Sequence, residues 1–489
     1  MRYAIVDCYT DEPSGLGVPP YLGTYPRYLY GALNDGRNSI YYLTIDDLRY
    51  AFSDQRVEIN RKTNPKIYNL TKNARNVQEI LSSVHEIIVI SGINTPGKYL
   101  SAVPGSLNEV ADFIAAFSAR KVLSGPAAIV GTRLQGGKYA EKLRLPIFEE
   151  IDFNYKGINT YETLHTERSG EILQQIPYPV VIEIESGKGC DVGKCSFCTE
   201  PLKNKVKYRE TDAIIAEGKT LADHGAQYFR LGKATCFYSF QHGNAGEIEK
   251  LLKGFSSLKP KVLHIDNVNP NKVIFGNGEQ ITKLVAEHCT EGNIAAFGVE
   301  SFDLEVVKAN KLNTAPDNAV KAIRIINKYG AARGSNGMPK YLPGINLILG
   351  LMHERKETLS INHNYLKSFL DEGLLLRRIN IRQVVPFEGT LLHELAGLKY
   401  LKKNKRHYFS WRKKVRREID HEMLKRLVPS GTILKDVYME VHDGNTTFGR
   451  QFGTYPLTVG VQEKLELKQL YDVKITDWML RSITGEIVR

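Results

Sequence analysis

The sequence of 489 residues lacks any uninterrupted apolar run long enough to cross a bilayer. Internal repeats and low-complexity tracts are also lacking. Its first residues, Met1 to Asp7, reach a carboxylate too early to form the apolar core of a secretory signal. We therefore predict a cytoplasmic protein with no membrane insertion, and the length indicates two or three domains.

Cysteine is scarce, with six in the whole chain, and this excludes a fold held together by disulfides. Half of the cysteines lie within nine residues, at Cys190, Cys195 and Cys198. Such a cluster in a reducing compartment predicts a metal site. Cys8 and Cys289 are expected to pack in the core, and Cys236 is expected to be buried and inert rather than a catalytic or radical-relay thiol.

Positive charge exceeds negative charge by twelve, and most of the excess lies in one segment. Residues 402–426 contain eleven lysines and arginines against three carboxylates. Apolar side chains recur there every four residues, which predicts a helix with one buried stripe: Trp411, Val415, Ile419, Met423 and Leu427. The basic faces are either simply solvated or bind an anion such as RNA phosphate, and the sequence leaves both interpretations open.

Strands and helices alternate along most of the chain, which predicts an α/β protein. Residues 1–150 fit a parallel, doubly wound Rossmann-like domain, and residues 151–178 fit a polar linker without periodicity. Residues 179–395 contain six strand–helix repeats and predict a partial (β/α)6 barrel of the TIM type, with its active site at the C-terminal ends of the strands. Residues 396–428 form the basic helical segment, and residues 429–489 a small β-rich C-terminal domain.

The clustered cysteines directly follow the first predicted barrel strand, residues 180–184. Three thiolates on one loop can bind three irons of a [4Fe–4S] cluster and leave the fourth iron open. The loop is also rich in glycine, as a chain that wraps closely around a cluster requires: Gly187, Gly189 and Gly193. This segment resembles the radical S-adenosylmethionine (SAM) superfamily, although four residues separate Cys190 from Cys195 where that family has three.

The resemblance implies that the open iron binds SAM and that electron transfer cleaves SAM to a 5′-deoxyadenosyl radical. A structural zinc site, completed by Cys236 or a histidine, is the alternative interpretation of the cysteines.

Further resemblances to this superfamily lie at the ends of the later strands. Residues 297–301 resemble the fourth-strand segment that contacts SAM. Residues 349–354 are similar to the fifth-strand Gly-Leu-Pro-Gly-Glu type, with Met352 and His353 in place of proline and glycine. The cofactor contacts implied by the predicted strand ends are Gly232, Lys233, Glu300, Ser301, Gly350, Glu354 and Arg382. The sequence identifies no catalytic side chain.

The N-terminal domain resembles the cobalamin-binding-type domain that precedes many radical SAM barrels, through residues 17–23 and the turn at residues 124–126. The Asp-x-His-x-x-Gly signature that supplies an axial histidine is absent. Cobalamin is therefore left open as a cofactor beside the [4Fe–4S] cluster and SAM, and a vestigial domain is the alternative. Most of the chain resembles an uncharacterised, largely archaeal radical SAM group.

Three functions remain open from the sequence. The leading one is a radical SAM enzyme that adds a methyl or methylthio group to RNA, with tRNA as the favoured partner. The basic helix supports it, as do residues 453–459 and 471–475, which resemble a small RNA-binding barrel. The alternatives are a radical SAM enzyme acting on a small molecule, lipid or protein, and a non-enzymatic metal-containing protein that binds nucleic acid. Either enzyme requires a reductant such as ferredoxin or flavodoxin.

Overall fold

The computed structural model describes residues 1–9, 21–52, 69–92, 104–130, 132–133, 140–141, 146–157 and 165–489. The chain forms two compact units. The first contains residues 1–185 and 209–229, and the second contains residues 186–208 and 230–489. Within the described ranges, no helix is both long enough and apolar enough to cross a membrane.

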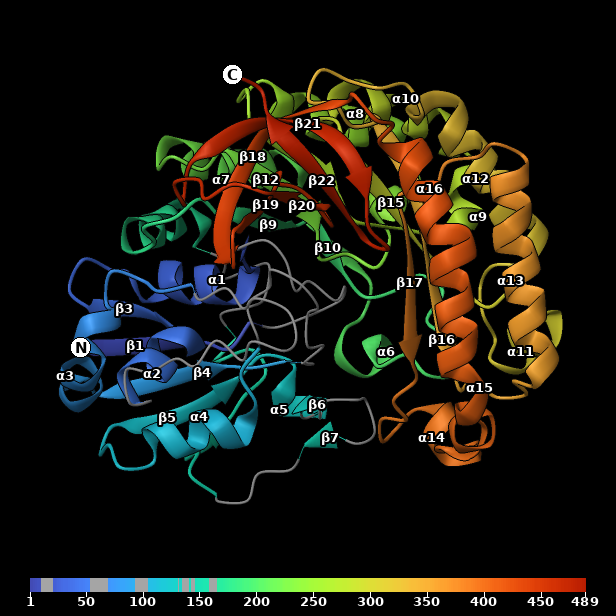
Figure 1. Cartoon of the computed structure of the whole chain (residues 1–489). Helices are drawn as coiled ribbons and strands as arrows, with labels where there is room; N and C mark the ends of the chain where they lie inside the picture. Colours follow the sequence, from blue (N-terminus) through green and yellow to red (C-terminus); the bar gives the residue numbers. More distant parts are fainter. Residues whose placement is uncertain are drawn as a thin grey trace. The chain divides into compact units, whose positions relative to one another are not determined.

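The N-terminal part of the first unit is built on a parallel sheet, shown in blue and cyan in Figure 1. Its strands, in spatial order, are β3 (Ser39–Thr44), β1 (Arg2–Asp7), β4 (Glu86–Ile90), β5 (Arg120–Ser124) and β8 (Glu150–Ile151). The helices between them are α1 (Thr24–Leu33), α2 (Ile45–Phe52), α3 (Val77–Ser83) and α4 (Leu107–Ile114). This order is that of a doubly wound sheet, so the Rossmann-like prediction is confirmed. Residues 17–20 of the predicted cobalamin-like loop lie outside the described residues.

The predicted linker contains a regular element, the 3₁₀ helix η2 (Thr166–Gln175). Side chains three residues apart eclipse in a 3₁₀ helix, so it lacks the 3.6-residue period by which an α-helix is detected in a sequence.

All six predicted barrel strands are present, each followed by helix. The strands are β9 (Val181–Glu185), β12 (Tyr228–Gly232), β13 (Val262–Ile265), β15 (Asn293–Glu300), β16 (Tyr341–Leu349) and β17 (Arg378–Gln383). The main helices between them are α7 (Thr211–Asp223), α8 (Ala245–Ser256), α10 (Gly278–His288), α12 (Pro316–Gly330) and α13 (Lys356–Asp371). In the second unit β15, β16 and β17 pair in parallel, so their C-terminal ends share one edge.

The basic segment is helical, as predicted. It comprises α15 (Lys399–Val415), a π-helical turn (Arg416–Asp420) and α16 (His421–Leu427). The five side chains of the predicted apolar stripe, from Trp411 to Leu427, are all buried. In Figure 1, α13 and α15 run side by side next to β17.

The C-terminal domain is a closed five-stranded barrel. Its strands, in spatial order, are β18 (Ile433–Asp443), β19 (Thr446–Arg450), β20 (Thr458–Val461), β22 (Ser482–Ile487) and β21 (Leu470–Trp478). The sequence predicts strands over residues 455–461, 471–476 and 481–483, which correspond to the last three in the chain, whereas it does not predict β18 and β19. The core is aliphatic and includes Val437, Met439, Val459, Val473 and Ile483.

Candidate functional site

The cysteine loop is framed by a small antiparallel pair of strands. The two strands, β10 (Gly187–Lys188) and β11 (Lys207–Tyr208), pair through Gly187 and Tyr208. The short helix α6 (Glu200–Lys203) follows the third cysteine. Between β10 and this helix the chain carries Cys190, Cys195 and Cys198, so the three thiols come from one continuous loop.

Gly189 is required by the geometry of this loop. It has a positive φ of 77°, and a Cβ added to it would lie 2.5 Å from backbone atoms of Lys205 and Val206. Its N–H donates to Oε1 of Glu200 at 3.0 Å, and its carbonyl accepts from the Thr235 hydroxyl at 2.9 Å. No other residue type could bring the two ends of the loop so close together.

The three thiols are partly exposed. The backbone N–H of Gly193 donates to Sγ of Cys190 at 3.4 Å, and that of Glu200 donates to Sγ of Cys198 at 3.4 Å. Burial raises the pKa of Cys195 to about 12 and that of Cys198 to about 11, and the neighbouring cysteines add to both shifts. Iron binding at these thiols must therefore release protons.

The cysteine loop offers the donor atoms that a [4Fe–4S] cluster requires. Among the described residues, no group of three or more His, Cys, Asp or Glu side chains is placed to hold one metal ion. A [4Fe–4S] cube sets a different requirement, because each of its cysteine ligands binds a different iron. Three thiols on one loop, two of them accepting backbone N–H bonds, suit that donor set.

Asn310 holds the loop in place. Its side-chain oxygen accepts from the hydroxyl of Ser196 at 2.7 Å and from the N–H of Met352 at 3.1 Å. Its amide nitrogen donates to the carbonyls of Val306 and Met352, at 2.8 and 2.9 Å. The residue is fully buried. It thus links the cysteine loop to the turn after β16, a role that no pattern in the sequence indicates.

Two of the predicted cofactor contacts, Glu300 and Arg382, meet at the ends of β15 and β17. Glu300 has a positive φ of 62° and follows a bulge, and a Cβ on Gly298 would lie 2.9 Å from its Oε1. Burial raises the pKa of Glu300 to about 8, and the guanidinium of Arg382 opposes this shift. Its Oε2 is buried without a hydrogen-bond partner in the described part of the chain. Because Glu300 also raises the pKa of Cys195, the structure brings these groups together.

Glu354 lies in a different environment from Glu300. Its Oε2 accepts from the N–H of Gly350 at 2.9 Å, and its Oε1 accepts from the hydroxyl of Tyr408 and from the amide of Asn404. Burial raises the pKa of Glu354 to about 7. A Cβ on Gly350, which has a positive φ of 93°, would lie 2.8 Å from Leu401. Both residues therefore fasten the turn after β16 to α15, and SAM contact by them stays a prediction.

The remaining predicted contacts are distributed along the same strand ends. Gly232 ends β12, and Lys233 follows it with a positive φ of 62°. Ser301 is buried, and its hydroxyl accepts from the N–H of Asp303 at 3.1 Å. Cys236 is buried, as predicted, and its sulfur accepts from the N–H of Asn269 at 3.2 Å.

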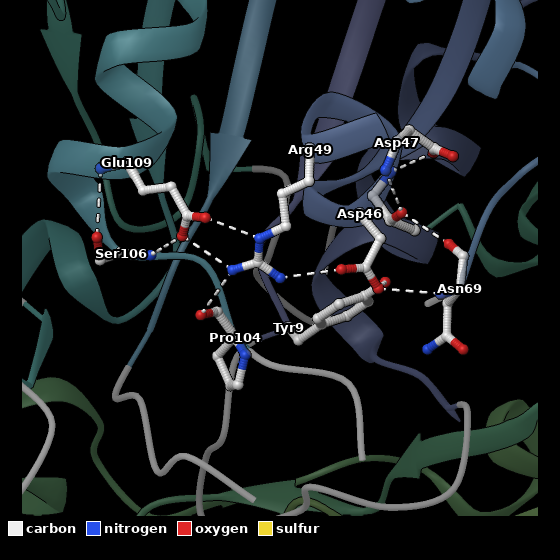
Figure 2. A network of polar contacts seen from close by, with 9 residues as sticks. Tyr9, Asp46, Asp47, Arg49, Asn69, Pro104, Ser106 and Glu109 are labelled. Atoms are coloured by element: carbon white, nitrogen blue, oxygen red, sulfur yellow. Dashed lines mark hydrogen bonds and ion pairs between the residues drawn. The ribbon is translucent and has the colours of Figure 1, made fainter. Parts of the chain in front are cut away.

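The N-terminal domain has a separate buried polar network, shown in Figure 2. Arg49 on α2 donates to Asp46 at 2.9 Å and to both carboxylate oxygens of Glu109 at 2.7 and 2.9 Å. The hydroxyl of Tyr9 and the N–H of Asn69 donate to the other oxygen of Asp46, each at 2.9 Å. These contacts join the end of β1 to α2 and to the start of α4.

The chain is similar in sequence to two archaeal proteins. It is 42% identical over 534 residues to an uncharacterized protein of Methanocaldococcus jannaschii, covering 100% of this chain and 93% of that one. It is 36% identical over 507 residues to an uncharacterized protein of Archaeoglobus fulgidus, covering 99% and 90%. No protein-family model matches the sequence.

Solved structures that are similar to this chain include radical SAM enzymes. One is the radical SAM methyltransferase TsrM of Kitasatospora setae, with 13% identity, a TM-score of 0.47 and coverage of 78% of this chain and 72% of that chain. Another is the cobalamin-dependent SAM radical enzyme OxsB, with 13% identity, a TM-score of 0.49 and coverage of 84% and 56%.

Proposed function

We propose that this chain, which belongs to the same protein family as its relatives from Methanocaldococcus jannaschii and Archaeoglobus fulgidus, is a radical SAM enzyme. The observation that carries the proposal is the loop that presents Cys190, Cys195 and Cys198 with backbone N–H bonds to two of the sulfurs. When bound there, a [4Fe–4S] cluster supplies the electron that cleaves SAM reductively. The electron comes from a one-electron reductant such as ferredoxin or flavodoxin.

The chain's own residues then have distinct roles. Gly189 and Asn310 fix the path of the cysteine loop. In this proposal Glu300 and Arg382, at the ends of β15 and β17, orient the charged groups of SAM; their electrostatic effects on each other and on Cys195 support this role. The apolar side chains around this region, including Leu351, Met352 and Val384, exclude water.

Anaerobic reconstitution tests this proposal. The protein should hold about four irons and four sulfides. It should release 5′-deoxyadenosine when SAM and dithionite are added. Alanine at Cys190, Cys195 or Cys198 should abolish both properties, whereas Cys289→Ala, away from the loop, should change neither. A colourless protein with one tightly bound zinc would overturn the assignment.

A second candidate, methyl or methylthio modification of RNA, is favoured by the surface of α15. Seven basic side chains on this helix and the adjoining turn are exposed: Lys402, Lys403, Lys405, Arg406, Lys413, Lys414 and Arg417. Phe409 lies among them with 69% of its surface exposed, as a base-stacking side chain would. Arg416 is not part of this face, because it donates to the Ile379 carbonyl and to Asp420.

Charge reversal tests the RNA candidate. If the basic face of α15 follows an RNA backbone, tRNA binding should weaken steeply with salt, because bound counterions are released. Glutamate at Lys402, Lys403, Lys413 and Lys414 should weaken binding and flatten the slope of log Kd against log salt. The matched control reverses charge at two exposed lysines of other elements, Lys253 and Lys367. If the α15 variant binds tRNA as tightly as the wild type does, the basic face is exposed to solvent but does not bind RNA.

Cobalamin is a further candidate cofactor for the N-terminal domain. The strand order places the ends of β1 and β4 at the point where the winding reverses, which is where doubly wound sheets bind ligands. Without the axial histidine signature, any corrinoid held there would be bound in its histidine-off form.

A further inference from the structure

One face of the sheet formed by β15, β16 and β17 carries polar side chains that are partly exposed. The parallel register aligns Gly298 with Asn346 and Asn346 with Asn380. Side chains alternate between the two faces of a strand, so Arg378, Asn380 and Arg382 lie on this face. Gly298 is exposed and the two asparagines and two arginines are partly exposed. The intervening residues of β16 face the other way and are buried: Ile345, Leu347 and Leu349.

The side chain of Arg378 is positioned on this face by close packing against its neighbours. A Cβ on Gly344, its register partner on β16, would lie 2.9 Å from Cγ of Arg378, so the glycine makes room for the arginine stem. The guanidinium lies 3.6 Å from the centroid of the Tyr455 ring. Such stacking fixes the plane of a guanidinium while leaving its N–H edge available.

The surroundings of Arg378 carry an excess of positive charge. Burial lowers its pKa to about 10, Tyr455 opposes this, and Arg382 and Arg481 lower it further. Two carboxylates also lie within electrostatic reach, but each has its own arginine: Asp266 lies 3.9 Å from Arg230, and Asp420 pairs with Arg416. Across the described residues, Arg378 has no ion-pair partner. The neighbouring Arg377 is 7% exposed, and its Nε is buried without a hydrogen-bond partner among these same residues.

We propose that Arg378, with the amides of Asn346 and Asn380, binds a carboxylate or phosphate group of a small-molecule substrate. An oxyanion fits because a stacked guanidinium offers it two parallel N–H donors, and the asparagine side chains supply further donors. The amides already touch each other, with Asn380 donating to Asn346 at 3.1 Å.

The inference rests on the proposed radical SAM function and adds a substrate class to it. Arg378 and Arg382 are four residues apart on one strand, which separates them by about 13 Å. Arg382 lies at the end that includes Glu300 and Cys195. A molecule anchored through its anion at Arg378 therefore extends toward the cysteine loop.

Binding of inorganic phosphate and of malonate to the full-length protein tests the proposal, with chloride at equal ionic strength as the reference. Isothermal titration should show saturable binding of at least one probe, and the stronger of the two identifies the oxyanion. Arg378→Gln should weaken it by about 10- to 100-fold, and Arg378→Lys by less, because lysine keeps the charge but loses the paired donors. The exposed-residue control Arg324→Gln, on α12 and outside the basic face of α15, should bind as the wild type does.

A measurement on the wild type tests the proposal even if the Arg378 variants do not fold. Phenylglyoxal modification followed by mass spectrometry should show Arg378 protected by the bound probe and the exposed Arg324 unprotected. Protection of Arg378 by SAM alone would assign it to the SAM carboxylate and overturn the substrate assignment. Probe binding that is unchanged in Arg378→Gln, or binding of RNA but of neither probe, would also overturn it. Release of 5′-deoxyadenosine by the wild type is measured in parallel. If it is released but the probes do not bind at Arg378, the substrate-site proposal is wrong while the radical SAM proposal stands.

Discussion

Replacing Glu217 by glutamine is expected to destabilise the first compact unit by about 3–5 kcal/mol, because it removes the carboxylate that pairs with two buried guanidinium groups. Glu217 on α7 is fully buried and pairs with Arg27 of α1 and with Arg209, the latter at 2.5 Å. Arg209 also donates to the Glu185 carbonyl at 3.0 Å and to the Tyr28 hydroxyl at 3.1 Å. The carboxylate therefore joins α1 to α7 and to the end of β9.

The effect of the Glu217 substitution should depend on pH. Burial alone would raise the pKa of Glu217, but the guanidinium groups of Arg209 and Arg27 hold it below the ordinary value of 4.5. A carboxyl group with a depressed folded-state pKa stabilises the fold fully above its unfolded-state pKa, and this contribution is lost as the pH falls through the folded-state value. The difference between wild type and Glu217→Gln should therefore be largest at neutral pH and shrink in acid.

Urea unfolding monitored by circular dichroism, at pH 7 and at pH 4, measures both effects. The control is Glu249→Gln, which breaks a fully solvated pair with Lys253 at 2.5 Å and should leave the unfolding curve unchanged. Equal unfolding midpoints for wild type and Glu217→Gln at pH 7 would contradict the structural role assigned to the buried network.

Periodicity was sufficient to predict the long elements of this fold, and its failures have local causes. The six barrel strands are rich in apolar residues and each is followed by a helical segment, and the apolar residues of the basic helix recur every four positions, so both were evident in the sequence. β18 was missed because bulges between Leu434 and Val437 and between Met439 and Val441 break its alternation. β10 and β11 have two residues each, too few to show any period.

The candidate site was predictable where its residues are close in sequence. The cysteine cluster and its glycines lie within twelve residues, from Gly187 to Cys198. Asn310 was not predictable, because it reaches Ser196 across a separation of 114 residues and a single asparagine after a helix carries no signal. Resemblance alone could not show which of Glu300 and Glu354 is available to a cofactor, since each lies near the end of a motif that follows a strand. In the structure the carboxylate of Glu354 accepts hydrogen bonds from Tyr408 and Asn404 of α15. Glu300 instead has a buried carboxylate oxygen without a hydrogen-bond partner among the described residues.

Asn310→Ala should lower both the stability of the second compact unit and its capacity to hold iron. The substitution leaves the N–H and carbonyl of Met352 and the hydroxyl of Ser196 without their partner. Burying such groups unpaired costs about 2–4 kcal/mol in total. Because Ser196 directly follows Cys195, the loosened loop should also bind the cluster less firmly.

Asn327→Ala is the matched control for Asn310→Ala. Asn327 on α12 also bridges two segments, accepting from the N–H of Leu375 at 2.8 Å and donating to the carbonyls of Leu375 and Ile323 at 3.0 Å each. Both variants should unfold at lower urea concentration than the wild type. After anaerobic reconstitution and challenge with a chelator, only Asn310→Ala should lose iron faster than the wild type, because only Asn310 contacts the cysteine loop. Equal rates of iron loss in the two variants would show that Asn310 supports the fold but does not position the cluster ligands.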